Sequence, residues 1–195
     1  MTNNTPALRK LTDNVYLFWA LLAVPAVYML AQRLVLHGKV AFVPLSGEIA
    51  AYLLIATMMV TPLMLLIGPL PWLKARRRYL GVASFLYTAL HLLFWLVNAN
   101  MGALLRSFVR IEILTGWVAM AVMVALAVTS TDSAVRKLGP RWKALQRWVY
   151  PAAVLTFVHW VMTTHNPQEA VILSAPLILL SVWRIVRYRR RISGV

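Results

Sequence analysis

Two histidines inside long apolar segments are the residues of this sequence most able to do chemistry. His91 lies in residues 79–97 and His159 in residues 149–164, and neither segment contains a charged residue. An ionisable side chain in a membrane-type segment is costly and usually faces the protein interior. We therefore treat both imidazoles as candidate functional groups, and their presence on two segments indicates a shared task.

The positions of these histidines predict that they lie at the same depth. If the third span runs outward from Tyr79, His91 lies about 18 Å along it at 1.5 Å per residue. If the fifth runs outward from Gln146, His159 lies about 20 Å along it. Two neutral imidazoles at one level on neighbouring helices can ligate a haem iron from both sides. The alternative is two unrelated histidines, each hydrogen-bonded to a neighbouring helix.

The composition indicates a protein that crosses a membrane several times. Of 195 residues, 61% are hydrophobic and 13% are charged, and that charged share is about half that of a soluble domain. The net charge of +15 is expected to serve contact with membrane lipid, and no nucleic acid partner is expected. Cysteine is absent, which excludes disulfides, thiolate metal sites, iron–sulfur clusters, covalently attached haem and cysteine-based catalysis.

Six apolar segments are long enough to be membrane helices. They cover residues 15–36, 49–67, 79–97, 112–129, 144–164 and 170–186. Pro151 is expected to distort the fifth helix, and Thr131 or Asp132 to cap a short helix before it. Residues 72–78 are expected to form a basic loop. The prediction is an all-α integral membrane protein, a six-transmembrane-helix bundle that forms a single domain over residues 1–195.

Basic residues fall mostly on one side of this arrangement. They gather in residues 9–10, 72–78, 136–147 and 187–191, whereas the opposite connectors are basic only at Lys39, Arg106 and Arg110. Because cytoplasmic loops are rich in Lys and Arg, we expect both termini in the cytoplasm. Both histidines then lie in the outer half of the bilayer.

The sequence around the two histidines also carries a family resemblance. Residues 77–91 read RRYLGVASFLYTALH, residues 129–160 read TSTDSAVRKLGPRWKALQRWVYPAAVLTFVHW, and residues 47–63 read GEIAAYLLIATMMVTPL. These motifs resemble the haem-binding membrane subunit of the periplasmic methionine sulfoxide reductase system, within the wider ferric-reductase-like transmembrane family. The resemblance covers residues 47–160. It implies haem b with iron ligated by His91 and His159, in the bacterial inner membrane.

One departure from the family pattern bears on the number of haems. The family usually carries another histidine thirteen residues before the one at 159. That position is Gln146 here, and the corresponding position of the third helix is Arg78. Neither side chain is a good haem ligand, so we expect one haem b.

Four arginines are candidate cofactor contacts. Arg106 and Arg110 lie just beyond the outer end of the helix that carries His91, where arginine can pair with a haem propionate. The alternative is an amphipathic connector whose arginines touch lipid phosphates. The resemblance implies that a flavin such as FMN can bind near Arg77 and Arg78, although lipid headgroup contact is the interpretation we prefer for them.

Four further residues are secondary candidates near the outer side. His37 and His165 lie at the outer ends of helices, where a solvated imidazole is the ordinary expectation. An alternative ligand or an electron-transfer contact with a partner is the other interpretation. Trp95 and Trp160 are candidates for the wall of a haem pocket.

The preferred function is electron transfer, with no catalytic residue in this chain. By resemblance, electrons come from a cytoplasmic flavin reductase or the quinone pool and go to a periplasmic molybdenum-containing reductase that repairs methionine sulfoxide. The chain has no G-x-G-x-x-G motif, so donor and acceptor are expected to be separate proteins.

Three alternatives remain open at the level of sequence. One is a ferric-reductase-like haem protein that serves another redox partner. A second is a proton-coupled carrier with His91 and His159 as relays, although such carriers usually need acidic residues at depth. The third is an assembly protein without a cofactor. The visible spectrum of the purified protein separates a haem protein from the last two.

Overall fold

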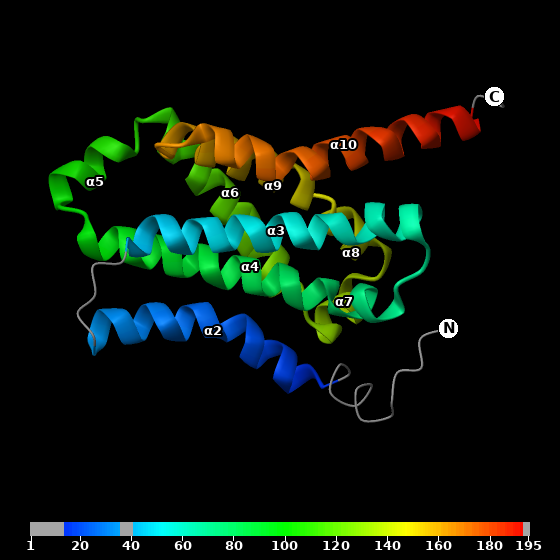
Figure 1. Cartoon of the computed structure of the whole chain (residues 1–195), viewed down its shortest axis with the longest axis horizontal. Coiled ribbons are helices and arrows are strands. Elements are labelled where there is room, and N and C mark those ends of the chain that lie inside the picture. Colours follow the sequence, from blue (N-terminus) through cyan, green and yellow to red (C-terminus); the bar gives the residue numbers. More distant parts are fainter. Residues whose placement is uncertain (1–13, 36–40, 193–195) are drawn as a thin grey trace. The chain divides into compact units, whose positions relative to one another are not determined.

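The computed structural model describes residues 14–35 and 41–192, which contain helices and no strand (Figure 1). The chain divides into two compact units, residues 1–42 and 43–195, and each is described by itself. In the first unit, α2 (Val15–Leu34) begins after Asn14, whose side chain accepts from the amides of Tyr16 and Leu17. His37 and Lys39, like the basic pair Arg9 and Lys10, lie outside the described residues.

The second unit contains the helices that surround the two histidines. They are α3 (Phe42–Ile67), α4 (Pro71–Asn98), α5 (Met101–Ser107), α6 (Ile111–Val128), α7 (Asp132–Leu138), α8 (Pro140–Gln146), α9 (Val149–Thr163) and α10 (Pro167–Ile192).

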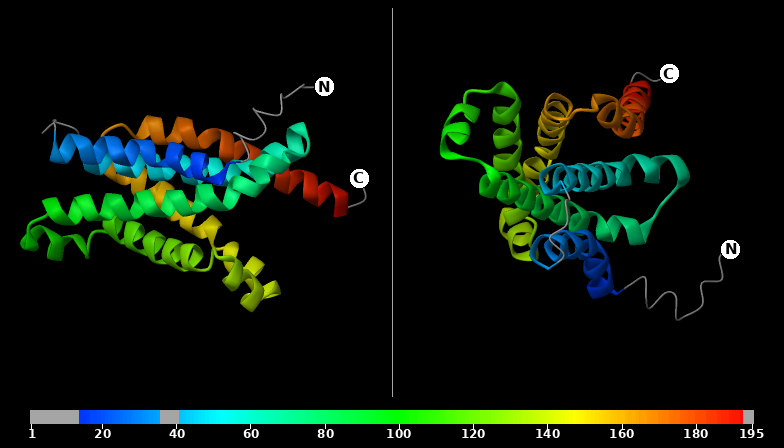
Figure 2. Two further views of the ribbon diagram at one scale, coloured as in Figure 1. Left: turned by 90° about the horizontal axis from the view of Figure 1, so that it is seen from below. Right: turned by 60° about the vertical axis from the view of Figure 1, so that its left-hand side comes forward.

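Close helix packing builds the core of this unit. α6 packs along α9, α4 packs on α6, and α10 packs on α9. α3 and α4 lie side by side (Figures 1 and 2), and the buried hydroxyl of Ser84 on α4 donates to the carbonyl of Ala50 on α3 over 2.8 Å. Alanines are buried on the helices of this core, including Ala50, Ala83, Ala119 and Ala152. Small residues let helix backbones approach closely where lipid supplies no hydrophobic drive between helices.

Five described helices are long and apolar enough to cross a membrane, namely α2, α3, α4, α6 and α10. The all-helical, multi-pass expectation is confirmed. The six-helix bundle stays a prediction, because the fifth expected span, residues 144–164, is not one continuous helix. It is divided into α8 and α9, and α9 has only 15 residues. The location of both termini in the cytoplasm also stays a prediction.

Pro151 explains the break between α8 and α9. Proline has no N–H to donate to the carbonyl of Arg147. That carbonyl instead accepts from the amide of Tyr150 over 3.1 Å, in a tighter turn. The distortion expected from this proline is therefore present, and it lies one turn before the proline.

The expectation of a loop over residues 72–78 is wrong. These residues form the first two turns of α4, which begins at Pro71. Proline is favoured at the first position of a helix, where its missing N–H would have no partner, and Lys and Arg are good helix formers. The expected cap of the short helix is confirmed, since the Thr131 hydroxyl accepts from the amide of Ala134 over 3.1 Å.

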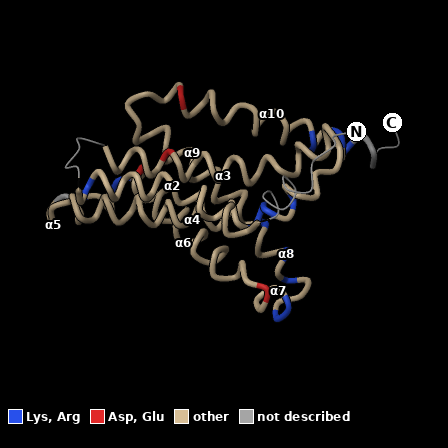
Figure 3. Tube along the Cα trace, turned by 60° about the horizontal axis from the view of Figure 1, so that its bottom comes forward, with Lys and Arg blue, Asp and Glu red and all other residues tan. Residues whose placement is uncertain are grey.

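The two ends of the second unit differ in charge. α5 lies at one end, and α7 and α8 lie at the other (Figure 2). Lys and Arg gather at the end with α7, α8 and the last turns of α10 (Figure 3). We call these the α5 end and the α7–α8 end.

Candidate functional site

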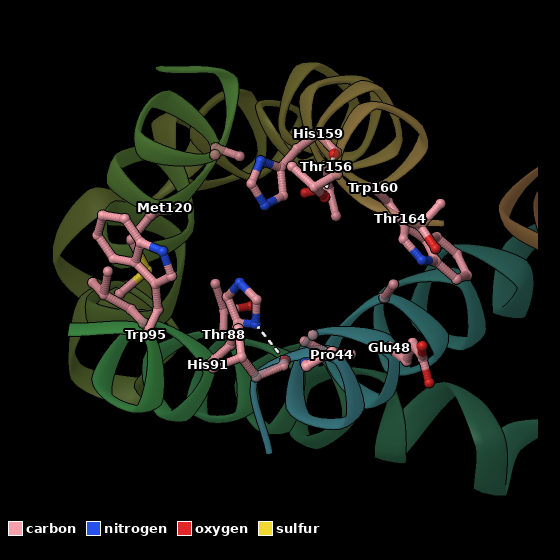
Figure 4. A pocket seen from close by; sticks show the side chains of 18 of the residues that line it. Pro44, Glu48, Thr88, His91, Trp95, Met120, Thr156, His159, Trp160 and Thr164 are labelled. Carbon is pink, nitrogen blue, oxygen red and sulfur yellow. Dashed lines mark hydrogen bonds between the residues drawn. The ribbon is translucent and has the colours of Figure 1, made fainter. Parts of the chain in front are cut away.

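His91 on α4 and His159 on α9 face each other across a cavity of about 300 Å³ (Figure 4). Their ring centroids are 6.2 Å apart and their planes are inclined by 85°. The two histidines lie far apart in sequence, and the packing of α4 and α9 on α6 brings them together. The structure therefore places both imidazoles at one level, as their spacing predicts.

Each imidazole is held by a backbone carbonyl of a neighbouring helix. The Nδ1 of His91 is 2.8 Å from the carbonyl oxygen of Val43, and the Nδ1 of His159 is 2.6 Å from that of Glu112. A carbonyl oxygen only accepts, so each Nδ1 carries the proton and donates it. Each Nε2 is then the unprotonated nitrogen with a free lone pair. In Figure 4 the free nitrogen of each ring points toward the other ring.

This arrangement fits a metal ion held between the rings. A metal–imidazole bond is about 2.0–2.1 Å long, and the ligating nitrogen is about 1.1 Å from the centroid of its ring. Two imidazoles on opposite sides of one metal ion would therefore have centroids about 6.2–6.4 Å apart. The observed centroid separation is 6.2 Å. In the part of the chain that the structure describes, no group of three or more His, Cys, Asp or Glu side chains could hold a metal ion. Two imidazoles leave the other coordination positions of a metal to other donors, and the four nitrogens of a haem would fill them.

Two glycines make room for the imidazoles, and they were not among the residues that the sequence pattern singled out. A Cβ at Gly47 would lie 2.8 Å from Nδ1 of His91, and a Cβ at Gly116 would lie 2.8 Å from Nδ1 of His159. Side chains essentially never come that close. One pattern in the sequence does point to both glycines. The tripeptide LSG at 45–47 resembles LTG at 114–116, and each ends in one of the two glycines.

The cavity wall is mainly apolar and aromatic. It includes Trp95 and Trp160, the expected pocket walls, together with Trp117 and Met120. The rings of Trp95 and Trp117 meet edge to face with centroids 6.5 Å apart. The indole Nε1 of Trp117 is buried and donates to no hydrogen-bond acceptor of the protein. These side chains form the apolar part of the wall, and the Trp117 indole leaves one hydrogen-bond donor in it.

Polar residues also line the cavity, among them Glu48, Thr156 and Thr164. The sequence pattern did not single out Glu48, because the second span was expected to begin after it, whereas α3 begins at Phe42. His165 also lines the cavity and is exposed, as expected for the end of a helix. Next to Glu48, Tyr52 on α3 donates to the Glu169 carboxylate on α10 over 2.9 Å.

The four candidate arginines lie outside the cavity lining. Arg110 precedes α6 and pairs with the Glu112 carboxylate over 2.5 Å, and Arg106 lies in the last turn of α5. Arg77 bonds the carbonyl of Thr57 and the hydroxyl of Thr61, each over 3.2 Å. Arg78 pairs with Asp132 over 2.6 Å. Arg77 and Arg78 thus tie the start of α4 to its neighbours, away from the imidazoles.

Comparison with known proteins identifies the family. Residues 46–157 match the family described as "Ferric reductase like transmembrane component", and the match spans more than half of the chain. The chain belongs to this family. The matched residues of this ferric reductase-like protein include His91, Gly47 and Gly116, and they end two residues before His159.

Curated relatives of this ferric reductase-like protein agree with the motifs. Proteins of Brucella ovis, Brucella canis and Brucella melitensis are each 36% identical over 151 residues, which is 75% of this chain and 68% of the relative. Each is described as "Protein-methionine-sulfoxide reductase heme-binding subunit MsrQ". No solved structure matches the chain. The resemblance drawn from the sequence is confirmed, and the chain is a multi-pass member of a transmembrane family.

Proposed function

We propose that this chain is the haem-binding, electron-transfer membrane subunit of a methionine sulfoxide reductase system. The observation that carries the proposal is the pair of Nδ1-anchored imidazoles of His91 and His159, 6.2 Å apart across an apolar cavity. The names of the Brucella relatives, which describe a haem-binding subunit, support it.

In this proposal the chain binds one haem b and orients it. His91 and His159 supply one iron ligand each, and the carbonyls of Val43 and Glu112 hold the protons on the opposite ring nitrogens. His91 and His159 would hold the haem iron, and a haem so held would supply one-electron transfer. Trp95, Met120 and their neighbours would give the haem an apolar surface to pack against.

Two side chains near the α7–α8 end support a single haem. At the position where the family usually has a histidine, the Gln146 amide donates to the carbonyl of Leu126 and the hydroxyl of Thr129, each over 3.3 Å. At the corresponding position of α4, Arg78 pairs with Asp132. Both side chains are committed to helix contacts, which supports one haem.

We further propose the partners and the setting. The acceptor is a periplasmic molybdenum-containing methionine sulfoxide reductase, and the donor is a cytoplasmic flavin reductase or the quinone pool. If FMN binds, Arg77 and Arg78 would be its contacts in this proposal, in addition to their bonds to Thr57, Thr61 and Asp132. The chain forms a single domain over residues 1–195 with six spans, in the bacterial inner membrane, with both termini in the cytoplasm. Clustered Lys and Arg at the α7–α8 end support this orientation.

Arg106 and Arg110 complete the proposed site. Both lie at the α5 end, near the end of α4 that follows His91. A propionate in an apolar setting needs a partner, and arginine offers a charged, two-pronged one. Because Arg110 already pairs with Glu112, Arg106 is the stronger candidate. Lipid phosphate is the competing partner.

The test is the visible spectrum of the purified protein with its haem-to-protein ratio. We expect the spectrum of a low-spin b-type haem and a ratio near one. Protein that is folded and colourless after expression with ample haem would refute the proposal. A ratio near two would refute only the single-haem part.

A further inference from the structure

The two imidazoles are held by short segments with the same arrangement of hydrogen-bonding groups. In the first, the carbonyl oxygen of Val43 accepts from Nδ1 of His91 over 2.8 Å and from the hydroxyl of Ser46 over 3.0 Å. Gly47 is the next residue, and a Cβ there would lie 2.8 Å from that Nδ1. The carbonyl is thus shared by an imidazole and a hydroxyl, next to a position that admits no side chain.

The second segment repeats this arrangement on α6. The carbonyl oxygen of Glu112 accepts from Nδ1 of His159 over 2.6 Å and from the hydroxyl of Thr115 over 2.8 Å. Gly116 follows, and a Cβ there would lie 2.8 Å from Nδ1 and 2.9 Å from Cε1 of the same ring. The carbonyl, the hydroxyl three residues later and the glycine four residues later recur in the same order. We call residues 43–47 and 112–116 the carbonyl clasps.

We propose that the two carbonyl clasps fix the planes of the axial imidazoles at right angles and set the reduction potential of the iron between them. The inference rests on the proposed haem ligation and goes beyond it. Ser46, Gly47, Thr115 and Gly116 are positioning residues in this proposal. They act through the two histidines and touch no substrate.

The geometry explains the orientation of the rings. A hydrogen bond from Nδ1 to a fixed carbonyl stops rotation of the ring about its Cβ–Cγ bond, and the adjacent glycine is what lets the ring approach that carbonyl. The carbonyls belong to different helices, α3 and α6, and the resulting ring planes are inclined by 85°. In a ferric low-spin haem, perpendicular axial planes leave two iron d orbitals nearly equal in energy, whereas parallel planes separate them.

The shared hydroxyls explain how the potential is set. A stronger hydrogen bond from Nδ1 makes the imidazole a more basic ligand, which favours ferric iron. The Ser46 and Thr115 hydroxyls use the same oxygens as the imidazoles. Each hydroxyl therefore weakens the carbonyl as an acceptor for the imidazole. The reduction potential is then higher than it would be if the imidazole were the only donor to that carbonyl.

The first experiment uses the unaltered protein with haem bound. Its electron paramagnetic resonance spectrum is expected to show one dominant low-field feature, the signature of perpendicular axial imidazoles. An ordinary rhombic low-spin spectrum, the signature of nearly parallel planes, would overturn this inference and leave the haem proposal intact. Absence of haem would overturn both.

The glycine variants test the clasps directly. Gly47→Ala and Gly116→Ala should each rotate a ring, moving the spectrum toward the rhombic type or abolishing the low-spin signal. Gly81→Ala is the matched control, because this helical glycine of α4 has its nearest neighbour, Thr57 Cγ2, at an ordinary 3.5 Å from an added Cβ. Gly47→Ala and Gly116→Ala proteins that both keep the original spectrum would overturn the proposal.

The hydroxyl variants test the potential without adding bulk, so they remain informative if a glycine variant does not fold. Ser46→Ala and Thr115→Val should each shift the midpoint potential downward, and the double variant should shift it further. Thr57→Val is the control, because the Thr57 hydroxyl donates to the carbonyl of Leu53. That carbonyl lies about 15 Å from the Val43 carbonyl along α3. An unchanged or raised potential in the double variant would overturn the role of the hydroxyls.

Discussion

The Nδ1 of His159 lies 2.6 Å from the backbone carbonyl oxygen of Glu112, not against its carboxylate. The carboxylate of the same residue pairs with Arg110 instead. A carboxylate acceptor would give the imidazole more negative character than a neutral carbonyl does. The hydrogen bond that holds His159 is therefore made by the main chain of α6.

The first prediction concerns iron ligation. His91→Ala and His159→Ala should each abolish the low-spin haem spectrum, because each removes one of the two proposed iron ligands. Absorption spectra and haem content of the purified variants provide the measurement. Glu112→Gln is the control and should keep the spectrum, because the backbone carbonyl remains. If both alanine variants keep full haem content and an unchanged spectrum, the ligand assignment is wrong.

The second prediction concerns orientation in the membrane. Single cysteines introduced at Arg77 and Arg141 should react with impermeant reagents only from the cytoplasmic side, and those at Arg106 and His165 only from outside. The chain has no native cysteine to interfere. Exclusive labelling of position 106 from the cytoplasm would contradict the topology.

The third prediction concerns the arginines at the α5 end. The double variant Arg106→Gln, Arg110→Gln should lower the midpoint potential and loosen haem, because a positive charge near the iron favours the reduced state. Redox titration and haem retention on dilution measure the two effects. Arg184→Gln removes one charge from α10, where this arginine donates to Tyr150 over 3.1 Å, and should change neither. Equal potentials and equal haem retention in the double variant and the unaltered protein would favour lipid phosphate as the partner of these arginines.

The fourth prediction compares two polar contacts of α4 in stability. Ser84→Ala should destabilise the protein by about 1 kcal/mol, because it removes a buried hydrogen bond that joins α4 to α3. Asp132→Asn should cost about 0–1 kcal/mol, because the ion pair with Arg78 is exposed to solvent. Thermal unfolding in detergent measures both. A larger loss for Asp132→Asn would show that the pair does more than a surface contact.

Some features follow from local sequence, and the structure agrees with them. Few charges in a long apolar chain require helices that cross a membrane, since only helices and closed barrels satisfy backbone groups in lipid. Thr131 caps α7 because its hydroxyl reaches an amide three residues away. Pro151 breaks the fifth span because it has no N–H to donate to the carbonyl one turn before it. In each case the cause and the effect lie within a few residues of one another.

The carbonyl clasps depend on tertiary structure. Val43 and Glu112 contact histidines 48 and 47 residues away in sequence. The residues next to Gly47 and Gly116 in sequence therefore do not show that each glycine leaves room for a histidine ring. In a segment that is apolar on every face, the hydrophobic pattern does not say which face meets which helix. The sequence by itself predicted that the two imidazoles lie at one level, and the structure agrees in that their rings face each other. Only the packing of α4 and α9 on their neighbours decided their separation, their tautomers and the right angle between their planes.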